Sequence, residues 1–164
     1  MSEGFSLLKV AHILSAAVIL GTGFGIAFFT WFGYRSALRT GEIGVLRATL
    51  RLTVIADAFL TAPAVAFQAA SGIALMLVFG WPLLSPWSVA VWSLFVVAGA
   101  CWLPVLRLQV LLRNEAQHAS SVAELPATFH LLFRWWFALG IPAFAAVTAI
   151  YWLMVAKPLA IGGG

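Results

Sequence analysis

The sequence predicts an all-α protein that forms a four-helix antiparallel bundle across a membrane. Of its 164 residues, 63% are hydrophobic and only 9% are charged, whereas about a quarter of the residues of a soluble domain carry charge. Four apolar runs are each long enough to cross a hydrocarbon core of about 30 Å, which takes roughly 20 helical residues. We expect residues 1–164 to form one integral membrane domain, with helices over about 5–32, 52–79, 87–112 and 132–156.

The same composition excludes several classes of protein. So few charges cannot cover a water-facing surface, which excludes soluble enzymes and disordered adaptors. The net charge is +4, but nine basic residues are too few for a dense stripe that follows nucleic-acid phosphates, so no nucleic-acid partner is expected. The single cysteine, Cys101, excludes an intramolecular disulfide framework. The expected partner is the lipid bilayer.

The first apolar run is expected to stay in the mature protein. It is longer than the core of a signal peptide, and no small-residue cleavage site interrupts it. Gly21 and Gly25 have the small-xxx-small spacing that lets two membrane helices approach closely. After this run we expect a loop that carries four arginines.

The charges of the three connections predict the orientation of the spans. The second connection, from Gly80 to Pro86, is uncharged, and its glycine and two prolines predict a tight turn. Lys9 and Lys157 are the basic residues at that face. By the positive-inside rule, the first and third connections lie in the cytoplasm and both termini lie outside. Seven of the nine basic residues belong to these two connections and their flanks: Arg35, Arg39, Arg47, Arg51, Arg107, Arg113 and Arg134.

Polar side chains within the apolar runs are the candidate functional residues, because each costs a few kcal/mol in hydrocarbon. With a rise of about 1.5 Å per residue, they fall into two layers. The outer layer surrounds His12, at a depth of roughly 10 Å, and the inner layer surrounds Asp57. The outer layer contains Lys9, His12, Gln68, Trp92 and Tyr151, and the inner layer contains Asp57, Arg107, Gln109 and Arg134.

His12 allows two interpretations. A neutral imidazole inside a helix bundle is a favoured axial ligand of haem iron, and Lys9, one turn away, would pair with a propionate or another anion. Alternatively, His12 is hydrogen-bonded to Tyr151, Gln68 or a backbone carbonyl, and Lys9 extends to the interface. No second histidine lies at this depth, because His118 and His130 belong to the inner end.

Asp57 also allows two interpretations. Arg107 or Arg134 could neutralise the carboxylate while Gln109 donates a hydrogen bond, which would join three helices by an ion pair. Alternatively, Asp57 is a carboxylate of a proton relay or an ion path.

Several segments resemble an uncharacterised bacterial family of predicted integral membrane proteins, over nearly the whole chain and in the same order. The family label names no reaction, so this resemblance implies a four-span protein of the bacterial inner membrane and no chemistry. The matching segments are Lys9-Val10-Ala11-His12, Gly21-Thr22-Gly23-Phe24-Gly25, Asp57-Ala58-Phe59-Leu60-Thr61-Ala62-Pro63 with Gln68 and Gly72, Cys101-Trp102-Leu103-Pro104-Val105 with Gln109, Gly140-Ile141-Pro142-Ala143-Phe144, and Trp152-Leu153-Met154-Val155-Ala156-Lys157-Pro158.

The four-helix plan, the early Lys-x-x-His and the closing Lys-Pro are also similar to the HemJ-type protoporphyrinogen oxidases and, more distantly, to copper-resistance membrane domains. HemJ-type proteins bind haem b through a histidine of the first helix, which His12 matches, and through a lysine in the third. The corresponding stretch, residues 88–94, holds no lysine or histidine. This resemblance therefore implies either a five-coordinate haem on His12 or a scaffold that has lost its cofactor.

The leading hypothesis is a small haem-associated or redox-accessory membrane protein. His12 would be the iron ligand and Lys9 an anion partner, and Gln68, Trp92 and Tyr151 would line the haem b pocket. The competing hypotheses are a non-catalytic assembly or accessory subunit and a transporter of a metal or small solute that uses Asp57. Glycine- and alanine-rich helix faces favour a homodimer or a larger membrane complex.

Overall fold

The computed structural model describes residues 3–156, which form a bundle of long helices. Helices α2 and α3 and the π-helical turn η1 between them form one continuous span. Among the described residues, four helical segments are long and apolar enough to cross a membrane, which confirms the all-α four-helix prediction. The elements are α1 (Glu3–Thr40), α2 (Ile43–Ala56), η1 (Asp57–Thr61), α3 (Ala62–Phe79), α4 (Pro86–His118), the short 3-10 helix η2 (Val122–Glu124) and α5 (Ala127–Ala156).

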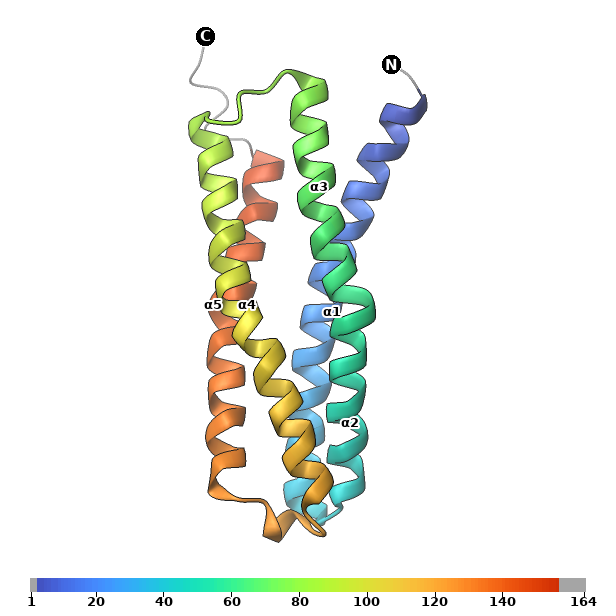
Figure 1. Ribbon diagram of the computed structural model, residues 1–164, viewed down its shortest axis with the longest axis vertical. Helices are drawn as coiled ribbons and strands as arrows, with labels where there is room; N and C mark the ends of the chain where they lie inside the picture. Colours follow the sequence, from blue (N-terminus) through green and yellow to red (C-terminus); the bar gives the residue numbers. More distant parts are fainter. Residues whose placement is uncertain (1–2, 157–164) are drawn as a thin grey trace.

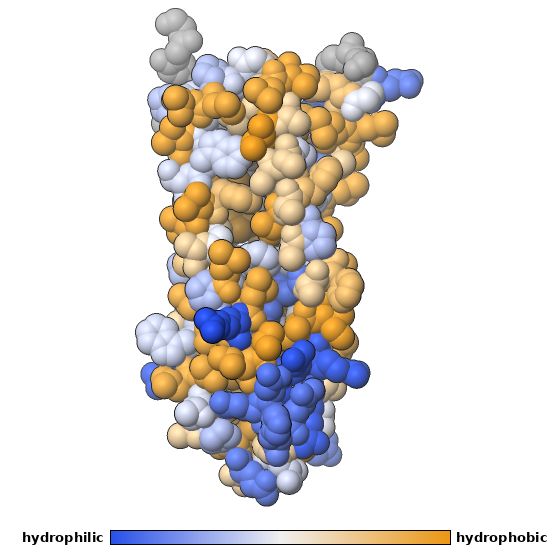
Figure 2. All heavy atoms as spheres, viewed as in Figure 1, coloured by the Kyte–Doolittle hydropathy of each residue, from blue (hydrophilic) through white to orange (hydrophobic). Residues whose placement is uncertain are grey.

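Successive spans run antiparallel, so the bundle has two chemically different ends (Figure 1). One end holds Glu3, Ala156 and the α3–α4 turn, and we call it the termini end. The other holds the α1–α2 turn and η2, and we call it the arginine end because the seven arginines of the first and third connections gather in this half. On the face that Figure 2 shows, the most hydrophilic residues are concentrated toward this end, and most of the rest of that face is apolar. Lys157 lies outside the described residues.

The helices extend further than their apolar runs. Arg35 and Arg39 belong to α1, and Arg47 and Arg51 belong to α2, so the expected arginine loop is reduced to residues 41–42. Likewise, α4 continues to His118 and α5 already begins at Ala127. Arginine, leucine and alanine are strong helix formers, so an apolar run marks the part of a helix in lipid rather than the helix itself.

The turn between α3 and α4 has the predicted length. Gly80 ends α3 with a φ of 65°, in the left-handed region that favours glycine. Its N–H donates to Leu77 O at 3.2 Å, and the next N–H donates to Met76 O at 3.0 Å. Ser85 then caps α4 by accepting a hydrogen bond from Ser88 N at 3.2 Å.

The main cluster of buried apolar side chains lies in the arginine half of the bundle, whereas Trp87, Ala98 and Ala146 are buried singly toward the other end. In the arginine half, α1, α2, α4 and α5 all contribute buried side chains. In the termini half, α3 packs chiefly against α1, and α4 packs against α5. The two helix pairs therefore share one packed base. The core consists of Ala37, Leu46, Leu50, Val105, Leu112, Ala116, Ala119, Leu125, Phe129, Phe133 and Trp136.

Arg47 of α2 fastens the end of α4 to this base. Its Nε donates to Ala116 O at 2.9 Å, and its Nη2 donates to Ala119 O. Carbonyls at the C-terminus of a helix have no partner within the helix, and a cation there also opposes the helix dipole favourably. The arginine thus satisfies two carbonyls that α4 itself leaves free.

Replacing Arg47 by methionine should lower the free energy of unfolding by about 1–2 kcal/mol, because the aliphatic stem stays while the charge-assisted hydrogen bonds are lost. Chemical unfolding in detergent micelles, followed by circular dichroism, would measure this change. The matched control is Arg39→Met, an exposed arginine of the same end. Equal stabilities of both variants would contradict the role of Arg47.

Candidate functional site

The outer polar layer is built around His12, whose two ring nitrogens are both hydrogen-bonded. Nδ1 lies 2.7 Å from Ser71 Oγ, and Nε2 lies 2.9 Å from Gln68 Nε2. The hydroxyl of Ser15 donates to Gln68 Oε1. These contacts join α1 to α3 at the termini end of the bundle.

The donors and acceptors of this cluster can be assigned from its chemistry. The hydroxyl of Ser71 donates to Phe67 O at 2.6 Å, so Nδ1–H of His12 must donate to Ser71. An amide nitrogen only donates, so Nε2 of His12 accepts from Gln68. In this assignment the imidazole is neutral, carries its proton on Nδ1 and accepts at Nε2.

A haem does not fit His12 in this arrangement. The lone pair that would bind iron accepts the hydrogen bond from Gln68. The ring also packs beside Gly72, where an added Cβ would lie 3.4 Å from His12 Cε1. Iron ligation would require Gln68 to leave and the imidazole to turn out of the α1–α3 interface.

Among the residues expected to line a haem pocket, Gln68 is the one that the described hydrogen bonds link to His12. Among the described residues, no hydrogen bond or ring contact joins Trp92 or Tyr151 to His12. Trp92 belongs to α4 and meets Phe95 edge-on, with ring centroids 6.1 Å apart. Tyr151 belongs to α5, and its buried hydroxyl has no hydrogen-bond partner in the described part of the chain.

Lys9 lies at the outer edge of the same helix pair. Its ammonium group sits 4.8 Å from the ring centroid of Phe5 and 5.7 Å from that of Phe79. Such cation–π contacts stabilise a cation near the membrane interface. Lys9 thus links the ends of α1 and α3 through two aromatic rings.

The inner polar layer centres on Asp57, which is only 4% exposed. Gln109 of α4, 1% exposed, donates from Nε2 to Asp57 Oδ2 at 2.6 Å. Trp136 of α5 donates from Nε1 to Gln109 Oε1 at 3.4 Å. Three of the four spans therefore meet in one buried chain of hydrogen bonds.

The structure does not bring Arg107 or Arg134 to Asp57. Both arginine side chains are exposed, and Asp57 forms no salt bridge within residues 3–156. Arg107 and Gln109 are two positions apart on α4, which turns their side chains roughly 200° away from each other. Arg134 and Trp136 have the same spacing on α5. The partner of the carboxyl group is thus a neutral amide rather than a cation.

Asp57 also begins the π-helical turn η1. The N–H of Ala62 bonds to Asp57 O, five residues back, and the turn buries both Asp57 and Thr61. Single π turns inside α-helices are rare and occur frequently at functional sites. This turn interrupts the second span at the position of the Asp57 carboxyl group.

Hydroxyl pairs, which the hydropathy pattern does not reveal, extend the polar contacts along the first and second spans. Thr22 and Thr61 lie 3.0 Å apart, and Thr30 and Thr53 lie 2.7 Å apart, each measured between Oγ1 atoms. The available signal was the spacing of Ser15, Thr22 and Thr30, which recur at seven- and eight-residue intervals and so share one helix face.

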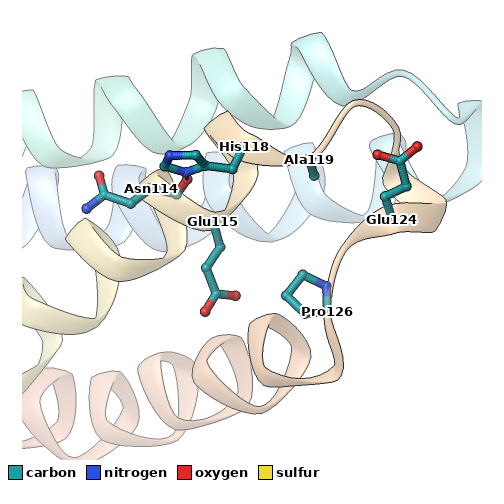
Figure 3. Close-up of a pocket in the computed structure, with 6 residues that line it drawn as sticks. All are labelled: Asn114, Glu115, His118, Ala119, Glu124 and Pro126. Carbon is teal, nitrogen blue, oxygen red and sulfur yellow. Dashed lines mark hydrogen bonds between the residues drawn. The ribbon is translucent and has the colours of Figure 1, made fainter.

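A separate cavity of about 460 Å³ opens at the arginine end (Figure 3). Glu115 extends its carboxylate into it, and His118 donates from Nδ1 to the carbonyl of Asn114 at 2.7 Å. The carboxylate of Glu124 accepts a hydrogen bond from Ser120 N at 2.9 Å. Within the described residues, no group of three His, Cys, Asp or Glu side chains could hold a metal ion. The cavity is lined by Asn114, Glu115, His118, Ala119, Glu124 and Pro126.

Comparison with known proteins identifies one family. The model of the family described as "Predicted integral membrane protein (DUF2269)" matches residues 6–158, which confirms the resemblance to a membrane family of unknown function. No curated protein and no solved structure matches the chain. The similarity to HemJ-type oxidases therefore stays a prediction.

Because Nε2 of His12 is already hydrogen-bonded to Gln68, we predict that it does not bind haem iron. Purified protein mixed with haem b should give no Soret band of a histidine-ligated iron, because Gln68 holds the required lone pair. Absorption spectra of the wild type, His12→Ala and Gln68→Ala would check this. A band that appears in the wild type and disappears only in His12→Ala would show that iron displaces Gln68 and would restore the haem hypothesis.

Proposed function

This chain belongs to the DUF2269 family of integral membrane proteins, and we propose that its function depends on proton exchange at Asp57 within the membrane. The observation that carries this proposal is the environment of the carboxyl group. It is nearly inaccessible, it begins a π-helical turn, and its described hydrogen-bond partner is the neutral amide of Gln109.

The physical argument concerns the cost of charge in an apolar medium. A carboxylate at membrane depth costs several kcal/mol unless a cation or many donors compensate it. Neither Arg107 nor Arg134 supplies that cation. Uptake of a proton removes the charge, while the hydrogen bond from Gln109 can be kept in both states. Binding and release of a proton is therefore the chemistry that this site supports best, as a relay or as the coupling group of a transporter.

The competing explanation is that Asp57 only joins helices through its hydrogen bond. An asparagine would serve that purpose about as well, because its Oδ1 accepts the same hydrogen bond, but it cannot bind a proton. Asp57→Asn therefore separates the two explanations.

In vesicles that contain a pH-sensitive dye, wild-type protein should accelerate the decay of an imposed proton gradient. Asp57→Asn should reduce the rate to that of protein-free vesicles, because the group that binds the proton is gone. The matched control is Arg134→Gln, which neutralises an exposed side chain, and circular dichroism would establish folding. Unchanged flux in folded Asp57→Asn would contradict proton exchange.

A second candidate is an assembly or accessory subunit, including a redox-accessory one. The observation in its favour is that the main buried cluster lies in the arginine half, while in the termini half α3 packs chiefly against α1 and α4 against α5. A second copy or a larger complex would add contacts there. Crosslinking in native membranes would test this role, and a strictly monomeric protein would oppose it.

We also propose that the protein lies in a bacterial inner membrane with its arginine end in the cytoplasm. The exposed arginines of that end support this orientation through the positive-inside rule. The uncharged α3–α4 turn would then face the outside.

Cysteine labelling tests the orientation in a Cys101→Ser background. Leu84 is 87% exposed in the uncharged turn, so Leu84→Cys should react with a membrane-impermeant maleimide in cells whose outer membrane alone is permeable. Glu42→Cys, in the exposed α1–α2 turn, should react only after lysis. The reverse pattern would place the arginine end outside.

A further inference from the structure

The donors and acceptors around Gln109 can be assigned in only one way. The indole nitrogen of Trp136 carries a hydrogen and has no lone pair to accept with, so it can only donate. The atom of Gln109 that it meets, at 3.4 Å, must therefore be the amide oxygen. The amide nitrogen is then the atom that faces Asp57, and it donates to Oδ2 at 2.6 Å.

This direction determines what Asp57 can do with a proton. Oδ2 accepts the hydrogen bond from Gln109, and the carbonyl oxygen of a carboxylic acid is its better acceptor. The hydroxyl proton of a neutral Asp57 then belongs on Oδ1, which forms no hydrogen bond within the described residues. If the amide of Gln109 were reversed, its oxygen would face the carboxyl group and would accept that proton instead.

We infer that Trp136 is a positioning residue which, by fixing the amide of Gln109, directs the exchangeable proton of Asp57 to Oδ1. This inference rests on the proposed proton exchange and adds which oxygen carries the proton and which residues select it. Trp136 is suited to this role because it is 4% exposed and belongs to the packed core, so its indole is held in place.

Infrared difference spectroscopy of the whole protein in lipid tests the inference. The probe is the C=O stretching band of a protonated carboxylic acid, assigned to Asp57 by its loss in Asp57→Asn. Trp136→Phe removes the N–H and keeps an aromatic ring. Trp135→Phe is the matched control, because Trp135 neighbours Trp136 on α5 but is 56% exposed.

In Trp136→Phe the band should broaden or split, because the amide of Gln109 then takes both orientations. Trp135→Phe should leave the band unchanged. Gln109→Met removes the donor, so the band should shift to higher frequency. The double variant with Trp136→Phe should match Gln109→Met alone, because Trp136 acts only through Gln109.

The outcomes separate the inference from the proposed function. Absence of any band sensitive to Asp57→Asn, at all pH values at which the protein stays folded, would overturn proton exchange at Asp57. A band that is present but identical in the wild type and Trp136→Phe would overturn the positioning role alone. If Trp136→Phe does not fold, Gln109→Met provides the second test, and a band unshifted in that variant would also overturn the inference.

Discussion

The structure depends on hydrogen bonds between side chains in an apolar medium. Lipid tails are as apolar as leucine, so burial of apolar side chains provides little drive for helices to associate within the bilayer. Polar side chains away from water are stabilised when they pair with each other, and this pairing determines which helices become neighbours. The bonds from His12 to Gln68 and Ser71, and the pair Thr22–Thr61, align the first span with the second. The bond from Gln109 to Asp57 then ties α4 to the second span.

The fold was predictable from the sequence because its causes are local. The length and apolarity of each run predict a span, and the glycine and prolines of the second connection predict its turn. Helix ends were not predictable from hydropathy, because the segment around Arg35 and Arg39 favours helix as strongly as the lipid-embedded part. The rotation of each helix about its axis, which decides which side chains face each other, was also not predictable from hydropathy. Arg107 lies at the depth expected for a partner of Asp57 but points away from it.

Only part of the candidate site was predictable from the sequence, for a related reason. Ionisable and amide side chains stand out in an apolar run, so His12, Asp57, Gln68 and Gln109 were found. Serine and threonine were overlooked because their hydroxyls can bond to their own helix backbone at little cost. The two polar layers also differ in whether they leave an atom of the central residue without a hydrogen bond. The lone pair of His12 is used within its cluster, whereas Oδ1 of Asp57 has no bond in the described residues.

The location of the main packed cluster in one half has a mechanical consequence. Stiffness in a protein follows packing density, so the arginine half resists deformation more than the two helix pairs beyond it. The π-helical turn lies near the boundary between these regimes, and Asp57 is its first residue. A change in bilayer thickness or lateral pressure would therefore bend the compliant half relative to the stiff one near η1.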